Sequence, residues 1–251
     1  MGLIKPLYTT KDAERCLKRF KPLPYGSEFY LNDELSFHFS DVGHITGSAA
    51  VHITSHEEGK NTVLSFTGDV GRYTDLLLKS PEPFIQSDYI ICESTYGDKL
   101  HDQQEDAAVK LLEVVANTCV EKKGKLIIPA FSLGRTQEIV FVLDKLKNEG
   151  KLPNIKIFVD SPLSVSATEI VRKHPEAFNE ELREYIKKDP DPFGFNNLTY
   201  IQDSTESKEL NEIEEPCIII SASGMADAGR VKHHIRNSIS DPKNTILMVG
   251  F

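Results

Sequence analysis

The sequence predicts an α/β fold in two parts, residues 1–97 and 98–251. In the first part, short strand-like runs alternate with turn-rich segments. From about residue 98, long helical patterns alternate with buried strand patterns, which is typical of a parallel sheet with crossover helices. Glycine-flanked histidine and acidic residues follow several strand patterns, and α/β enzymes present their reactive groups in such loops.

The first part opens with a short helix and continues with strands. Thr9 or Thr10 can cap the helix, and Pro22 and Pro24 end it. Strands are expected at 35–39, 49–54, 62–66 and 89–92.

In the second part, Gly124 and Gly150 are suited to end the first two helices, because glycine accepts the left-handed conformation found there. The two Asp-Pro steps within 189–197 predict an exposed loop. Helices are expected at 103–122, 136–148, 164–188, 204–214 and 229–239, and strands at 125–130, 155–159, 217–221 and 245–249.

Composition sets limits on function. With 39 % hydrophobic residues the chain can form a core, which excludes a disordered protein. Its 29 basic and 38 acidic residues give a formal net charge of −9, whereas nucleic-acid binders usually carry a basic surface. RNA binding therefore requires a local basic groove, and an acidic enzyme acting on a small molecule remains an alternative.

The cysteines and the apolar runs indicate the compartment. Four scattered cysteines without a C-x-x-C pair are expected to be reduced, structural thiols. No apolar run reaches the length of a membrane span, and the N-terminus lacks a signal-peptide pattern, so we expect a cytoplasmic protein without a membrane partner.

Three segments carry most of the chemistry. They are D-V-G-H-I-T-G-S-A at 41–49, S-F-T-G-D-V-G-R at 65–72 and I-I-C-E-S-T-Y-G-D at 90–98. The arrangement resembles the metallo-β-lactamase superfamily, and the third segment resembles its RNA-processing β-CASP branch. The resemblance implies part of an αββα sandwich followed by a β-CASP α/β domain with a mainly parallel sheet.

The resemblance also implies roles for three residues. His44 and Asp69 correspond to metal ligands, with Asp69 bridging two zinc ions that activate a water for phosphodiester hydrolysis. Glu93 corresponds to the acid that takes part in proton transfer, so Asp69 and Glu93 are the expected catalytic residues. Each residue also has a structural alternative. His44 can be a structural histidine after a strand, Asp69 can cap the following turn, and Glu93 can bond to the adjacent backbone.

Two further segments are candidate phosphate sites. In P-A-F-S-L-G-R-T-Q-E at 129–138, backbone N–H groups at a helix start, Ser132 and Arg135 can bind an anion, although Arg135 can instead pair with Glu138. The segment S-A-S-G-M-A-D-A-G-R-V-K-H-H at 221–234 resembles one found in bacterial and archaeal β-CASP proteins. Its candidate RNA-contacting residues are Ser221, Ser223, Arg230, Lys232, His233 and His234.

The H-x-H-x-D-H string of the resembled family does not occur in the 251 residues. The resemblance places that string before His44 and two more histidine motifs after Met225. We therefore expect an internal part of a longer zinc-dependent nuclease, inactive and weakly zinc-binding alone, with RNA as partner and a homodimer as an option. A non-catalytic scaffold of the same fold and a small-molecule metallohydrolase remain the rival interpretations.

Overall fold

The computed structural model describes residues 6–98 and 107–249, which form two compact units. The first unit contains the described residues up to Asp41, together with Ala49–Gly68 and Pro83–Cys92. The second contains Val42–Ser48, Asp69–Glu82 and the described residues from Glu93 onward. The division at residues 97 and 98 stays a prediction, since the loops 42–48 and 69–82 group with the second unit.

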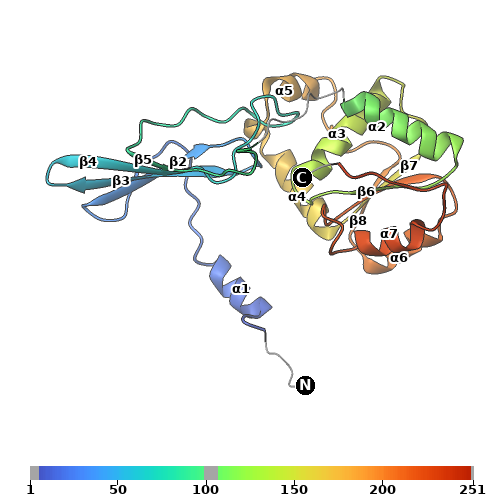
Figure 1. The fold of residues 1–251 in the computed structure, drawn as a ribbon, viewed down its shortest axis with the longest axis horizontal. Coiled ribbons are helices and arrows are strands. Elements are labelled where there is room, and N and C mark those ends of the chain that lie inside the picture. The colour runs from blue at the N-terminus through green and yellow to red at the C-terminus, as the bar shows by residue number, and fades with distance from the viewer. Residues whose placement is uncertain (1–5, 99–106, 250–251) are drawn as a thin grey trace. The chain divides into compact units, whose positions relative to one another are not determined.

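The first unit is built around a five-stranded sheet in the order β1-β2-β3-β4-β5 (Figure 1). Neighbouring strands are antiparallel from β1 to β4, whereas β5 runs parallel to β4. The strands are β1 (Phe29–Tyr30), β2 (Leu35–Asp41), β3 (Ala49–Glu57), β4 (Lys60–Phe66) and β5 (Tyr89–Ile91). Helix α1 (Thr10–Leu17) begins after Thr9, whose hydroxyl and backbone both bond to Asp12, so the predicted cap is confirmed.

A buried histidine lies within this sheet. His52 of β3 has no exposed surface, and its Nε2 and Nδ1 pair with the hydroxyls of Ser40 and Ser65 at 2.8 and 2.6 Å. His38, opposite it on β2, stacks on its ring. Burial, and then the charge of His38, lower the pKa of His52 below its ordinary value, so the sheet contains a neutral imidazole at neutral pH.

We predict that acidification weakens the protein through His52. Because burial lowers its pKa, the unfolded chain takes up the proton first once the pH falls below about 6.5. This contribution to stability is therefore fully present above that pH and declines below it. Urea unfolding at pH 7.5 and 5.5 should show a smaller decline for His52→Asn than for the parent protein, and equal declines would contradict the assignment.

The second unit is built around a sheet of five parallel strands in the order β10-β6-β9-β7-β8 (Figure 1). The strands are β6 (Leu126–Pro129), β7 (Lys156–Asp160), β8 (Leu198–Ile201), β9 (Cys217–Ser221) and β10 (Thr245–Ile246). All residues of β6 and β9 are buried, as expected for central parallel strands. The predicted α/β fold with a mainly parallel sheet is confirmed.

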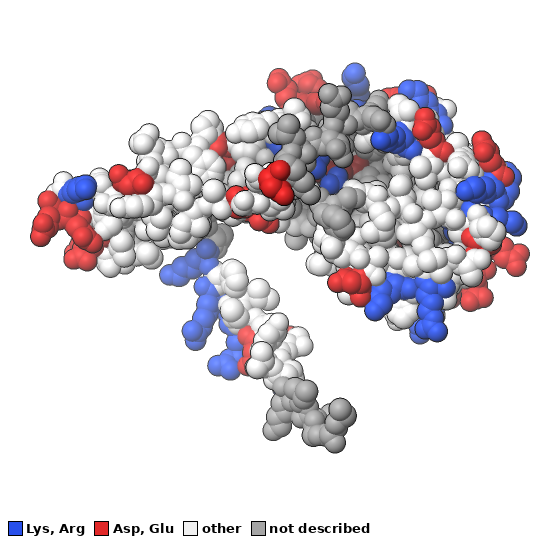
Figure 2. Space-filling model, viewed as in Figure 1, with Lys and Arg blue, Asp and Glu red and all other residues white. Residues whose placement is uncertain are grey.

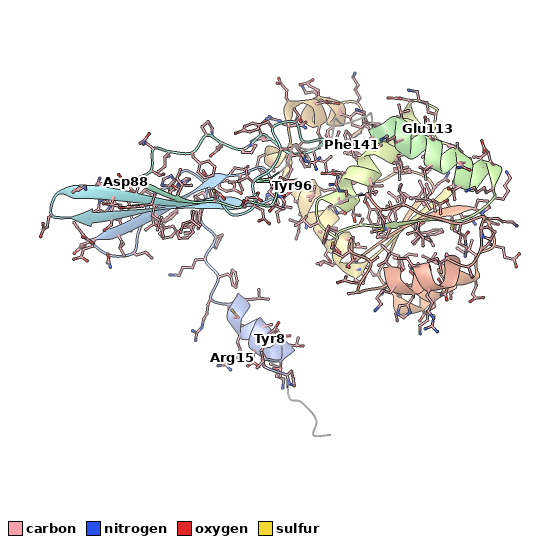
Figure 3. All side chains as sticks on the ribbon, viewed as in Figure 1. Tyr8, Arg15, Asp88, Tyr96, Glu113 and Phe141 are labelled. Carbon is pink, nitrogen blue, oxygen red and sulfur yellow. The ribbon has the colours of Figure 1, made fainter. Side chains whose placement is uncertain are left out.

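Helices cover both faces of this sheet. Leu126 and Ile128 point into a core shared with α2 to α5, whereas Ile127 between them packs on the opposite side with α6 and α7. Phe141 of α3, labelled in Figure 3, is 1 % exposed within the larger core. The helices are α2 (Ala107–Val115), α3 (Arg135–Asn148), α4 (Pro162–Lys173), α5 (Glu180–Ile186), α6 (Ser204–Glu212) and α7 (Val231–Ser238).

Several expected elements differ from the observed ones. The expected helix 164–188 is broken, because Pro175 starts a short 3-10 turn (Pro175–Ala177) between α4 and α5. The expected helix 103–122 changes at Ala116 into a π-helical segment (Ala116–Glu121), and its first residues lie outside the described ranges. Strand β8 was not predicted, although it follows the expected loop 189–197.

The cysteines are all free, as expected, but only two of them are core residues. Cys119 and Cys217 are buried, and burial raises their pKa to about 12 and about 11. Cys16 and Cys92 are exposed, so the expectation of a structural thiol is wrong for these two. Within the described residues, no helix has the length and apolar composition needed to cross a membrane.

A buried carboxyl group in α3 gives a stability prediction. Asp144 is fully buried; its Oδ2 accepts a hydrogen bond from the Tyr185 hydroxyl at 2.7 Å, but its Oδ1 finds no donor among the described residues. Burial raises the pKa of Asp144 from 3.8 to about 6, although the Tyr185 hydrogen bond opposes this.

Asp144→Asn is therefore expected to stabilise the protein at pH 7 by about 1–3 kcal/mol. The folded state holds the Asp144 proton more tightly than the unfolded state, so stability is lost as the pH rises from about 4 to about 6. Unfolding free energies at pH 4 and pH 7 test this, because the gain should appear only at pH 7. A loss of stability at both values would contradict it.

Candidate active site

Three loops of the second unit carry the predicted reactive residues. His44 lies in the loop after β2, Asp69 after β4 and Glu93 after β5. The His44 Nε2 and the Asp69 Oδ2 are 3.8 Å apart, and their side chains are 44 % and 73 % exposed. The structure thus brings together the two residues predicted as metal ligands and leaves both accessible to solvent.

Two glycines lock the His44 and Asp69 loops together. The Gly71 amide donates to the Val42 carbonyl at 2.8 Å, and a Cβ on Gly71 would lie 2.0 Å from the Gly43 oxygen. Gly43 itself has φ +60°, and a Cβ there would lie 2.4 Å from the Lys79 oxygen. Only glycine fits at either position, so backbone contact fixes the spacing of His44 and Asp69.

Glu93 supports the Asp69 loop from the neighbouring strand end. Its carboxylate accepts hydrogen bonds of 2.6 Å from the Thr95 hydroxyl and the Val70 amide. These two hydrogen bonds lower the pKa of Glu93, and the nearby His44 adds to the effect. Glu93 is therefore an ionised, half-buried group that holds the residue next to Asp69 in place.

The donor set at His44 and Asp69 fits a divalent metal ion in part. Zinc takes imidazole nitrogen and carboxylate oxygen ligands at about 2.0–2.2 Å, so two ligands of one ion lie about 3.3–3.6 Å apart. The observed 3.8 Å is close to this spacing. Among the residues that the structure describes, no third histidine, cysteine, aspartate or glutamate joins them, so these residues supply two ligands.

The turn between β6 and α3 lies beside His44. Leu133 and Gly134 line one small hollow together with His44, Ile45 and Glu138. Gln137 braces this turn, because its side chain accepts from the Gly134 amide and donates to the Ser132 carbonyl. The first predicted phosphate-binding turn, at 129–138, and the candidate metal ligand His44 therefore face the same space.

Arg135 adopts the structural alternative predicted for it, an ion pair with Glu138 in place of an anion contact. Its guanidinium is paired with the Glu138 carboxylate. Burial raises the pKa of Glu138, although the charges of Arg135 and Arg72 act against this. The Ser132 hydroxyl shares a hydrogen bond of 3.1 Å with Ser161.

Asp160, at the end of β7, organises the second candidate phosphate segment. Its Oδ2 accepts from the Ser207 hydroxyl and pairs with the His234 Nε2, both at 2.6 Å, and its Oδ1 accepts from the Arg230 guanidinium at 2.7 Å. The Ser221 hydroxyl donates to the Asp160 carbonyl. Burial alone raises the pKa of Asp160, but these side-chain hydrogen bonds outweigh it and hold the pKa below its ordinary value.

The predicted RNA-contacting residues therefore divide into two groups. Ser221 and His234 are each 1 % exposed, and Arg230 is tied to Asp160 and the Gln202 carbonyl. Lys232 and His233 are exposed on α7, where Figure 2 shows basic side chains gathered on the face in view. Ser223 is half-buried and bonds to Asp227 at 2.7 Å.

Sequence reasoning missed three residues that shape the site. Asp160 is not among the predicted site residues, although an acid at the end of a buried strand is a usable signal. Gly71 and Arg72 stand in the 65–72 segment, but their contacts depend on a neighbouring loop.

A cavity of about 390 Å³ at the opposite, amino edge of the parallel sheet, lined by Lys123, Lys156 and Glu215 among others, contains none of the predicted site residues.

Comparisons with known proteins agree with this architecture. A family model described as the Beta-Casp domain matches residues 136–251. The chain is 31 % identical over 247 residues to ribonuclease TTHA0252 of Thermus thermophilus, covering 98 % of this chain and 56 % of that protein. It is 32 % identical over 248 residues to the transcription termination factor FttA of Methanocaldococcus jannaschii, covering 97 % of this chain and 38 % of that protein.

An RNase J-like protein of Methanocaldococcus jannaschii is also similar, at 30 % identity over 247 residues, with coverage of 97 % of this chain and 55 % of that protein. The chain thus spans about half the length of these relatives, or less. Residues 136–251 thus match a Beta-Casp domain, and nearly the whole chain is similar to β-CASP proteins of the metallo-β-lactamase superfamily.

Proposed function

We propose that the protein containing this chain is a metal-dependent, RNA-processing hydrolase that cleaves phosphodiester bonds. The observation that supports it best is the exposed pair of His44 and Asp69, 3.8 Å apart on loops locked by glycine contacts. Relatives named as ribonucleases support RNA as the substrate class. An RNA substrate also favours a cytoplasmic location.

In this proposal His44 and Asp69 hold metal, zinc by preference for this donor set. Metal ions bound there supply a water activated for attack and stabilise the leaving oxygen. Asp69 and Glu93 are the proposed catalytic residues, and Glu93 also fixes the Asp69 loop through the Val70 amide. A homodimer remains a prediction without support from these contacts.

The proposed phosphate contacts come from the loops at the carboxyl edge of the parallel sheet. Ser132, Lys232 and His233 have surface available for a direct contact. Arg135 and Arg230 reach RNA only if they exchange a carboxylate partner for a phosphate. Ser221 and His234, which are buried, support the segment from within unless the loop opens.

Cleavage of labelled single-stranded RNA by the intact protein, with and without a chelator, tests the proposal. Asp69→Asn should reduce the cleavage rate by at least about 100-fold. Asp33→Asn, which changes an exposed aspartate of the first unit, should leave the rate unchanged. A small-molecule hydrolase would instead cleave an ester or lactam, and would lack the salt-dependent RNA affinity expected for a polyanion ligand.

A further inference from the structure

An exposed aromatic ring stands at the carboxyl edge of the parallel sheet. Phe131 follows the buried end of β6 and is 43 % exposed, although the residues before it are fully buried. Ligands of open α/β sheets bind at this edge of the strands. A single exposed phenylalanine is common on protein surfaces, so the surroundings of the ring must indicate whether it binds a ligand.

The backbone that carries the ring is held rigidly. The Phe131 carbonyl accepts hydrogen bonds from both the amide and the hydroxyl of Thr136, the latter at 2.7 Å. The next residue, Ser132, is braced through its carbonyl by Gln137, and Gln137 also bonds to Thr168 at 2.8 Å. The backbone from which the ring projects is therefore fixed, which reduces the entropy lost when a ligand binds.

The ring contacts the loop after β9 and remains partly exposed to solvent. Gly224, in the loop after β9, lies so close that a Cβ there would be 2.8 Å from Phe131 Cδ2. The adjacent Met225 is 49 % exposed. The ring therefore packs against the backbone at Gly224 and still keeps exposed aromatic surface suited to a planar partner.

The surface is continuous with the candidate active site. Phe131 is three residues from Gly134, so at most about 10 Å of chain separates their Cα atoms. Gly134 lines the same hollow as His44, and Ser132 between them carries a hydroxyl. A polymer bound at the His44 and Asp69 loops is therefore within reach of this ring.

We propose that Phe131 is a stacking surface for an unpaired RNA base next to the cleavage site. The inference rests on the proposed RNA-cleaving function and adds to it a preference for single-stranded substrate. Aromatic rings stack on every base but cannot reach a base inside an intact duplex. The partner is thus recognised by its exposed base, while the neighbouring loops contact its phosphates.

Binding of a fluorescent, unpaired RNA to the intact protein without added metal tests the proposal. Phe131→Leu keeps the apolar volume but removes the π face, and should raise the Kd about 5- to 100-fold. Phe131→Tyr should bind like the parent. An abasic ribose-phosphate oligomer of the same length should bind the parent and Phe131→Leu equally, which also shows that the variant is folded.

Phe20→Leu is the matched control, because Phe20 is 72 % exposed in the first unit, and it should leave the RNA affinity unchanged. If the parent protein binds RNA and Phe131→Leu binds it equally well, the stacking surface is refuted while the proposed function stands. If the parent protein does not bind RNA at all, the proposed function itself fails, and the stacking proposal fails with it.

Discussion

Replacing Asp160 with alanine is expected to lower the free energy of unfolding by about 3–5 kcal/mol. Asp160 is fully buried and is bonded to Arg230, His234 and Ser207. Removing one partner of a buried, charged network leaves the other polar groups desolvated and unpaired. Chemical denaturation at pH 7 measures the loss directly.

One further variant separates charge from volume at position 160, and a second, at position 227, serves as the control. Asp160→Asn retains the shape but removes the charge that Arg230 faces, so it should destabilise less than alanine. Asp227→Ala, at an exposed carboxylate that accepts a hydrogen bond from the Ser223 hydroxyl, should change stability far less. A loss below about 1 kcal/mol for Asp160→Ala would refute the organising role of this carboxylate.

Replacing Gly71 with alanine is expected to reduce RNA cleavage by the intact protein by at least about 100-fold. The added Cβ would lie 2.0 Å from the Gly43 oxygen and 2.7 Å from the His44 amide nitrogen, so the His44 loop must move. A displacement of about 1 Å at a reacting group is enough for an effect of this size.

Gly26→Ala provides the comparison for Gly71→Ala. Gly26 has φ +70° but an added Cβ meets nothing within 4 Å, so this change carries backbone strain without a clash. It should cost some stability and leave the cleavage rate of the folded protein unchanged. Full activity in Gly71→Ala would mean that the glycine contact does not set the spacing of His44 and Asp69.

The fold could be predicted largely because its signals are local. Hydrophobic runs identified β6, β7 and β9, and Gly150, with φ +69°, follows the α3 end as expected. The elements that were predicted wrongly or missed also have physical explanations. Pro175 interrupts an otherwise helical pattern, and β8 has only one buried residue, so its sequence lacks the run of buried residues that marks the central strands.

The candidate site could be predicted only in part. The resemblance of the segments at 41–49 and 65–72 to the metallo-β-lactamase superfamily indicated His44 and Asp69, and the structure places them 3.8 Å apart. Their spacing depends on a contact between Gly43 and Gly71, which are far apart in sequence. Similarly, the pairing of His234 with Asp160 joins residues 74 positions apart, and no local pattern shows that the histidine is buried.

The most direct test of the account is RNA cleavage by His44→Ala, Asp69→Asn and the double variant of the intact protein, each at saturating metal. If the two residues hold the same metal centre, each single change should reduce the rate by at least about 100-fold, and the double variant should be little worse than either. Metal-dependent cleavage at the parent rate by the double variant would contradict the account.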